Sequence, residues 1–362
     1  MINYTKQYID EKDIYNVTKS LKSSYITQGL YVRKFETDLA KYFGSKYSIV
    51  VNSGTSALDL ACKSIGIKKN DKVVTTPITF LASSNSAIYN GAKIKFIDIE
   101  KDTFLMDLNK FEKYLKKNHI KLAVMVDFAG NVNDWDKIRY LSKKYNFFTI
   151  NDNCHAIGSK FKKNLGYAVK YADIVTHSYH AAKIITTGEG GSILTNNKRF
   201  YERAKILRSH GVIKSEQINK KKGLWFYNMR YLGYNYRLSD LNCALGITQL
   251  KKLNTFLKKR SHLVKNYISA FEKYENISFQ KVGDNVDHSY HLFILKINFK
   301  NFRISKKLFF EKLKRKGISL QVHYIPIFLQ SYYRKKFKVN IKEYKNSMNY
   351  YNGAVTLPVF HQ

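Results

Sequence analysis

Strand and helix patterns alternate from residue 46 to residue 196, and this alternation constrains the fold more than any other feature of the chain. Short runs rich in β-branched and aromatic residues are typical of buried strands, and the segments between them carry apolar residues at helical spacing. Such alternation predicts an α/β fold with a mostly parallel sheet covered by helices. The predicted strands are 46–51, 72–77, 92–99, 121–128, 146–152, 172–178 and 190–196, and the predicted helices include 55–66, 107–117 and 134–145, with Asp107 and Asp134 as N-caps.

The pattern changes near residue 245. Residues 250–274 have the spacing of one long amphipathic helix, and a strand (289–299), a helix (306–317) and a second strand (318–327) are predicted after it. That order is typical of a smaller α+β unit. We therefore predict a large domain over 1–247 and a small C-terminal domain over 248–362.

Composition excludes several classes of protein. With 44% hydrophobic residues the chain can bury a large core, and it has no apolar run long enough to span a bilayer. The N-terminus lacks the apolar segment of a signal peptide, so we expect neither secretion nor a membrane partner. The three cysteines, Cys62, Cys154 and Cys243, match no disulfide or metal pattern, which indicates a protein of the reducing cytoplasm without a metal.

The net charge is extreme at +36, from 63 basic and 27 acidic residues. One interpretation is a polyanionic partner, so a non-enzymatic nucleic-acid-binding protein is an alternative function. However, the lysines are scattered over predicted helix surfaces rather than gathered in a tail or stripe. Coding bias in a chain rich in Lys, Asn, Ile and Tyr explains this scatter better, and we predict no specific nucleic-acid partner.

Three features with chemical potential follow predicted strands. The segment "NSGTSAL" (52–58) joins a strand to a helix with small residues, so the free N–H groups at the start of that helix could cradle a phosphate. Asp152 ends a buried strand, where open α/β sheets place their ligands. Lys183 lies beyond the next strand, and glycines follow it at 188, 190 and 191. Alone, each is more often a connecting turn, a helix N-cap or a solvated surface charge.

Together these features match the needs of pyridoxal 5′-phosphate. A lysine in a partly dry pocket can act as an amine nucleophile and form a Schiff base with the cofactor. A carboxylate keeps the pyridine nitrogen protonated, and a cradle of N–H groups holds the phosphate. The combination of Lys183, Asp152 and the segment 52–58 therefore predicts a pyridoxal-phosphate site.

The chain resembles the DegT/DnrJ/EryC1/StrS sugar aminotransferases, and the similarity runs in order from about residue 3 to the end. The segments that carry it include "TPITFLASSNSAI", "DFAG", "DNCHAIGS", "HSYHAAKIITTGEGG" and "LGYNYRLSDLNCALGITQLKKL". The resemblance implies the fold type I architecture of pyridoxal-phosphate enzymes: a large domain with a mostly parallel mixed sheet flanked by helices, plus a smaller α+β domain.

The resemblance also assigns roles to residues. Lys183 matches the Schiff-base lysine and Asp152 the partner of the pyridine nitrogen. His155 matches a position near the phenolic oxygen of the cofactor, and Phe80 matches the aromatic residue that stacks on its ring. The residues matched to phosphate binding are Thr55, Ser56 and Ser178, together with Asn235, which reaches the site of the neighbouring subunit. A homodimer with shared active sites is therefore implied.

The implied reaction moves an amino group from L-glutamate to the 4-keto group of a UDP-linked 4-keto-6-deoxy-N-acetylhexosamine, giving a 4-amino sugar of the pseudaminic acid type for surface glycans. Another nucleotide-sugar aminotransferase, with a dTDP carrier or amination at C3, is the nearest alternative. Two departures from the family pattern stand out. His177 replaces a usual phenylalanine, and the chain stops at "TLPVFHQ", where a last helix is expected.

Overall fold

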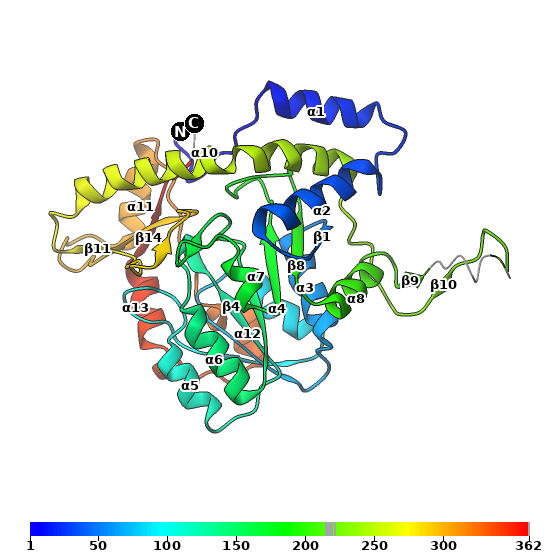
Figure 1. The fold of residues 1–362 in the computed structure, drawn as a ribbon. Coiled ribbons are helices and arrows are strands. Elements are labelled where there is room, and N and C mark those ends of the chain that lie inside the picture. Colours follow the sequence, from blue (N-terminus) through cyan, green and yellow to red (C-terminus); the bar gives the residue numbers. More distant parts are fainter. Residues whose placement is uncertain (214–219, 221, 361–362) are drawn as a thin grey trace.

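The computed structural model describes residues 1–213, 220 and 222–360. Its centre is a seven-stranded sheet in the order β1-β8-β7-β5-β4-β2-β3 (Figure 1). Strands β2, β3, β4, β5 and β7 run parallel, whereas β8 is antiparallel to both of its neighbours. The bounds are β1 Tyr47–Val51, β2 Lys72–Thr75, β3 Lys93–Phe96, β4 Leu122–Val126, β5 Phe148–Asp152, β7 Ile174–Ser178 and β8 Gly191–Thr195. The predicted strands and the mostly parallel α/β sheet are confirmed.

Helices cover both faces of this sheet because the strands are apolar on both faces. On one face, α3 and α8 share a buried cluster with the small residues of α4. On the other face, α2, α5, α6, α7 and the first half of α10 build a second cluster. The bounds are α1 Glu11–Leu21, α2 Leu30–Phe43, α3 Gly54–Ile65, α4 Ala82–Tyr89, α5 Leu108–Leu115, η1 Phe128–Gly130, α6 Trp135–Tyr145, α7 Tyr167–Tyr171, α8 Lys198–Arg208 and α10 Asp240–Phe271.

Side-chain caps fix where the helices begin. Asp107 accepts hydrogen bonds from the backbone N–H groups at the start of α5, and Asp134 does the same for α6. Each carboxylate satisfies donors that the first helical turn leaves unpaired. Both predicted N-caps are confirmed. Ser53 caps α3 in the same way, and that helix begins where β1 ends.

The C-terminal part of the chain is built on the second half of α10. From Leu263 onward, helix α10 packs its apolar residues against a three-stranded antiparallel sheet, β11-β13-β14. The remaining elements are β6 Lys160–Phe161, β11 Ile277–Phe279, β12 Val286–Asp287, β13 Phe293–Ile297, α11 Lys306–Arg315, η2 Ile327–Leu329, α12 Ser331–Lys336, η3 Ile341–Glu343, α13 Lys345–Gly353 and β14 Ala354–Leu357. The proposed division at 247/248 falls inside α10 and stays a prediction.

The strand predicted over 318–327 is wrong. Only Gln321 pairs with a strand, through a bridge to Thr356 of β14, and the following residues leave the sheet. Pro326 has no N–H to continue a ladder, and the next residue, Ile327, donates instead to the carbonyl of Pro77. Because the backbone leaves the sheet here, His323 and Tyr324 line a cavity instead.

Strands β9 (Val212–Ile213) and β10 (Asn228–Met229) pair at a distance from the body of the molecule (Figure 1). The chain around β10 exposes several large apolar side chains, namely Leu224, Trp225, Tyr227, Met229 and Leu232. Within the described part of the chain, no helix has the length and apolar character needed to cross a membrane.

Candidate active site

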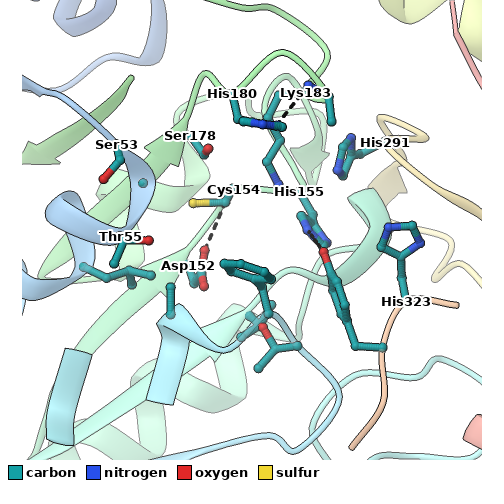
Figure 2. Close-up of a pocket in the computed structure, with 18 of the residues that line it drawn as sticks. Ser53, Thr55, Asp152, Cys154, His155, Ser178, His180, Lys183, His291 and His323 are labelled. Carbon is teal, nitrogen blue, oxygen red and sulfur yellow. Dashed lines mark hydrogen bonds between the residues drawn. The ribbon is translucent and has the colours of Figure 1, made fainter. Parts of the chain in front are cut away.

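A cavity of about 370 Å³ opens at the carboxyl ends of β5 and β7, beside the first turn of α3 (Figure 2). This edge of a parallel sheet is where α/β proteins bind ligands. Six of the eight residues that the sequence pointed to line the cavity together: Thr55, Phe80, Asp152, His155, Ser178 and Lys183. They come from four separate stretches of the chain, so the fold alone brings them to one place.

One wall of the cavity is the N-terminus of α3. Ser53 caps the helix, and Gly54 and Thr55 follow it with Ser178 of β7 alongside. A β-carbon on Gly54 would lie 2.8 Å from the Ser178 β-carbon, so only glycine allows this close approach. The wall therefore offers backbone N–H groups and hydroxyls at the positive end of a helix dipole, which is a site suited to a phosphate.

The other two predicted residues lie outside the cavity lining. The Ser56 hydroxyl donates to Asn52 at 2.6 Å and lies 2.9 Å from the Ser53 hydroxyl, so it supports the turn from within. Asn235 is exposed and forms an isolated bridge with Ser209. The phosphate-binding role of each residue stays a prediction, and for Asn235 that role concerns a neighbouring subunit.

Asp152 supplies a buried carboxylate at the end of β5. Its side-chain oxygens accept hydrogen bonds from the Ser83 hydroxyl at 2.6 Å and from the Cys154 N–H at 3.3 Å. Ser83 is itself 2.8 Å from the Thr79 hydroxyl, which holds it in place. A carboxylate oriented in this way and facing a cavity is ready to pair with a protonated nitrogen of a ligand.

Lys183 brings an amine to the same cavity. Burial lowers its pKa below the ordinary value, although the nearby Cys154 and Asp152 raise it in part. In the described part of the chain, no carboxylate lies within ion-pair distance of the amine. A lysine whose charged form is disfavoured carries more free amine near neutral pH, and free amine is the form that attacks a carbonyl.

His155 is held as a neutral imidazole on the opposite wall. Its Nδ1 accepts the Ala129 N–H at 3.4 Å, so Nε2 carries the proton and donates to the Tyr324 hydroxyl at 3.0 Å. Burial, followed by the nearby charge of Lys183, lowers the pKa of His155 well below its ordinary value. The ring can therefore orient a polar ligand atom without bringing a charge of its own.

Several lining residues escaped the sequence analysis. Tyr324 packs its ring 6.0 Å from that of Phe80, and His323 beside it bonds the Thr356 hydroxyl at 2.9 Å. His291 and Tyr4 complete this side of the cavity (Figure 2 labels His291 and His323). The strand predicted over 318–327 gives His323 and Tyr324 no place near Lys183.

The unusual His177 points away from the cavity. Its ring packs 4.7 Å from that of Phe43, and its Nδ1 lies 3.4 Å from the Ser192 hydroxyl. Burial lowers the pKa of His177 to about 3, so the side chain is a neutral ring in the core. It therefore fills the space of the expected phenylalanine without affecting the site.

The residues present fit pyridoxal 5′-phosphate. The cofactor has a phosphate, a basic ring nitrogen and an aldehyde, and the cavity offers a counterpart for each: the first turn of α3, Asp152 and Lys183. Two observations of the structure support this fit, namely the close approach that only Gly54 allows and the lowered pKa of Lys183. The exposed ring of Phe80, 54% accessible, provides a flat apolar surface at the mouth.

The chain belongs to the DegT/DnrJ/EryC1/StrS aminotransferase family, whose model matches residues 7–362. It is 43% identical to the UDP-4-amino-4,6-dideoxy-N-acetyl-beta-L-altrosamine transaminase of Campylobacter jejuni, over 99% of this chain and 92% of the relative. The Helicobacter pylori aminotransferase PseC has the same fold, with a TM-score of 0.90, 30% identity and coverage of 99% and 94% of the two chains. The PLP-form structure of Spr1654 from Streptococcus pneumoniae gives a TM-score of 0.89 at 27% identity, over 99% and 93% of the chains.

These similarities confirm three predictions. The protein has the fold of the sugar aminotransferases, it is a transaminase of this family, and its cofactor is pyridoxal 5′-phosphate. The non-enzymatic nucleic-acid-binding alternative finds no support. The roles of individual residues rest on the geometry described above.

Proposed function

We propose that this protein transfers an amino group from L-glutamate to the 4-keto group of a UDP-linked 4-keto-6-deoxy-N-acetylhexosamine. The observation that carries the proposal is the arrangement of Lys183, with its lowered pKa, in one cavity with Asp152 and the first turn of α3. The 43% identity to a transaminase named for a UDP-4-amino sugar supports the choice of substrate. The product would serve the synthesis of pseudaminic acid or a related surface glycan.

The side chains divide the work of the reaction. When bound, pyridoxal phosphate supplies an electron sink for the α-carbon of the amino donor. The Lys183 amine would remove the proton from that carbon as a general base and would deliver it, as a general acid, to the cofactor carbon that carried the aldehyde. Asp152 keeps the ring nitrogen protonated by pairing with it. His155, neutral and fixed between Ala129 and Tyr324, orients the phenolic side of the ring.

The proposal includes a homodimer whose subunits complete each other's sites. The apolar side chains around β10 support it, because Leu224 and Trp225 are 87% and 82% exposed. Strand β10 itself lies away from the body of the subunit (Figure 1). Asn235 follows that segment and is exposed, as a residue that reaches into a partner would be. The mouth of the cavity also leaves Phe80 uncovered, and a second subunit would close it.

We further propose that the enzyme works in the cytoplasm. Its three cysteines, Cys62, Cys154 and Cys243, are all free thiols, and burial raises the pKa of each above its ordinary value. Free thiols persist where the compartment is reducing.

The test is a direct assay of products. Protein loaded with pyridoxal phosphate is incubated with L-glutamate and a panel of UDP- and dTDP-linked keto sugars, and the products are identified by mass and by NMR. We expect a UDP-linked 4-amino sugar from wild-type protein and from Lys307→Ala, which removes an exposed lysine that does not line the cavity. Lys183→Ala should give none. A 3-amino or dTDP-linked product would select the alternative substrate, and no product from any sugar would contradict the proposal.

A further inference from the structure

Asp127 is a fully buried carboxylate that the reaction described above does not use. It lies between β4 and η1, and it does not line the cavity. In the described part of the chain, no lysine, arginine or histidine lies within ion-pair distance of its oxygens. A buried carboxylate without a cation is costly, so hydrogen bonds must compensate its charge.

Side chains from three segments supply those hydrogen bonds. Oδ1 of Asp127 accepts the backbone N–H of Asn133 at 3.0 Å and its side-chain amide at 2.7 Å. Oδ2 accepts the side-chain amides of Asn151 at 2.9 Å and Asn153 at 3.2 Å, and the Tyr167 hydroxyl at 2.8 Å. Burial raises the pKa of Asp127 above its ordinary value, and these hydrogen bonds offset part of the rise. Because N–H groups can only donate, the arrangement favours the ionised carboxylate.

The two asparagines bonded to Oδ2 are the chain neighbours of Asp152. Side chains alternate between the faces of a strand, so Asn151 and Asn153 lie on the face opposite to Asp152. The Asp127 N–H also donates to the carbonyl of Asp152 at 3.2 Å. Asp127 with Asn151 and Asn153, here called the Asp127 clamp, therefore holds the chain on both sides of Asp152 from behind the cavity.

The clamp lies where the sheet ceases to fix the chain. The parallel pairing of β5 ends at Asp152, which is opposite Val126 of β4 and Thr176 of β7. On the cavity side, the Ser83 hydroxyl and the Cys154 N–H bond the carboxylate oxygens of Asp152. Those two donors orient the oxygens, whereas the clamp fixes the backbone from which the carboxylate projects. A fully bonded buried network of this kind rigidifies its surroundings.

We propose that Asp127 is a positioning residue for the transamination: by holding Asn151 and Asn153, it keeps the Asp152 carboxylate against the ring nitrogen of the cofactor. The inference rests on the role that the proposed function gives to Asp152. A reacting group works only where a supporting shell locks it in place, and a misplacement of about 1 Å can cost on the order of 100-fold in rate. Without the clamp, the carboxylate would shift from the ring nitrogen, and the nitrogen would lose the opposite charge that keeps it protonated.

The test is nitrogen NMR of protein loaded with pyridoxal phosphate that is isotope-labelled at its ring nitrogen, recorded slightly above neutral pH. The chemical shift distinguishes a protonated from a neutral pyridine ring. We expect the protonated shift in wild-type protein and a shift toward the neutral ring in Asp127→Ala. Turnover of that variant should fall about 10- to 100-fold. Its KM for the keto sugar should change less than about twofold, because the clamp does not touch the cavity.

Asn133→Ala is the matched control. It removes the side-chain hydrogen bonds to Asp127 Oδ1 and, at 2.8 Å, to the carbonyl of Val126, but it leaves Asn151 and Asn153 in place. The thermal unfolding midpoint should fall because two buried hydrogen bonds are lost. The nitrogen shift and the turnover should stay at the wild-type values, so the control separates loss of stability from loss of positioning.

A second variant decides the question if Asp127→Ala does not fold. The double change Asn151→Ala and Asn153→Ala opens the clamp while Asp127 keeps Asn133 and Tyr167 as donors. In Asn151 the side-chain oxygen has no hydrogen-bond partner in the described part of the chain, so its removal leaves no new group unpaired there. The double variant should show the same change of nitrogen shift as Asp127→Ala.

Three results would overturn the inference. The first is a wild-type nitrogen shift in whichever of these clamp variants folds. The second is an equal change of shift in Asn133→Ala, because the shift would then follow stability. The third is a neutral ring nitrogen in wild-type protein, which would also contradict the role of Asp152. The product assay judges the proposed function separately: an enzyme that aminates UDP-linked keto sugars keeps that function whatever the nitrogen shift.

Discussion

Gly54→Ala tests how tightly the first turn of α3 is packed at the cavity. The new β-carbon would lie 2.8 Å from the Ser178 β-carbon and 3.1 Å from its hydroxyl oxygen. Overpacking of this kind costs about 1–3 kcal/mol. Because alanine is the better helix former, about 1 kcal/mol is regained. Because a 2.8 Å contact is closer than real β-carbons come, the upper part of the overpacking range applies, about 2–3 kcal/mol. We therefore expect a net loss of about 1–2 kcal/mol in the free energy of unfolding, or a factor of about 5–30.

The assays are urea unfolding of the cofactor-free protein and titration with pyridoxal phosphate. The same clash displaces the N–H groups that face the phosphate, so cofactor affinity should fall along with stability. Gly283→Ala is the matched control, since the nearest atom to its β-carbon would be a Val286 methyl group at 3.8 Å. Ser178→Gly in the Gly54→Ala background removes the clashing atoms and should restore the stability. Wild-type stability and cofactor affinity in Gly54→Ala would refute the reasoning.

Three further predictions concern single side chains. Asp152→Asn keeps an acceptor for Ser83 but loses the negative charge. The variant should therefore fold and bind cofactor, while its turnover falls about 100-fold or more. Turnover within tenfold of wild type would contradict this role of Asp152. Tyr324→Phe removes the partner of His155 Nε2, and we expect a loss of about 1 kcal/mol, measured as an approximately fivefold lower kcat/KM. Burial lowers the pKa of His177 from 6.5 to about 3. Between these two pH values the unfolded chain binds a proton at His177 and the folded protein does not. Acidification through this range therefore lowers the free energy of unfolding. His177→Phe should flatten that slope by up to about 1.4 kcal/mol per pH unit in urea unfolding at several pH values.

Most strands of the large sheet could be predicted from the sequence, and so could three features of the site: the segment 52–58, Asp152 and Lys183. Buried strands between helices have a strong local pattern, and Asp107 and Asp134 mark helix starts by their own side-chain bonds. Asp152 and Lys183 could be paired because each follows a neighbouring strand of the parallel sheet, and parallel strands end at one edge.

The place of Tyr324 on the opposite wall could not be predicted, because it meets His155 only through the fold. Tyr324 bonds His155 across 169 positions of the chain, and no local pattern encodes that contact. The apolar and polar alternation of 318–327 is the same for a strand and for an extended segment that lines a cavity. The two differ in whether a neighbouring strand is present, and within 318–327 only Gln321 pairs with one, at Thr356 of β14.

The central claim is that Lys183 is the amine that holds the cofactor. Protein reconstituted with pyridoxal phosphate is reduced with borohydride, digested and mapped by mass spectrometry, with Lys183→Ala treated in parallel. We predict one modified lysine per chain, at residue 183, because its lowered pKa and its place beside Asp152 set it apart from the solvated lysines. A modification that falls on other lysines, or that persists unchanged in Lys183→Ala, would contradict the account.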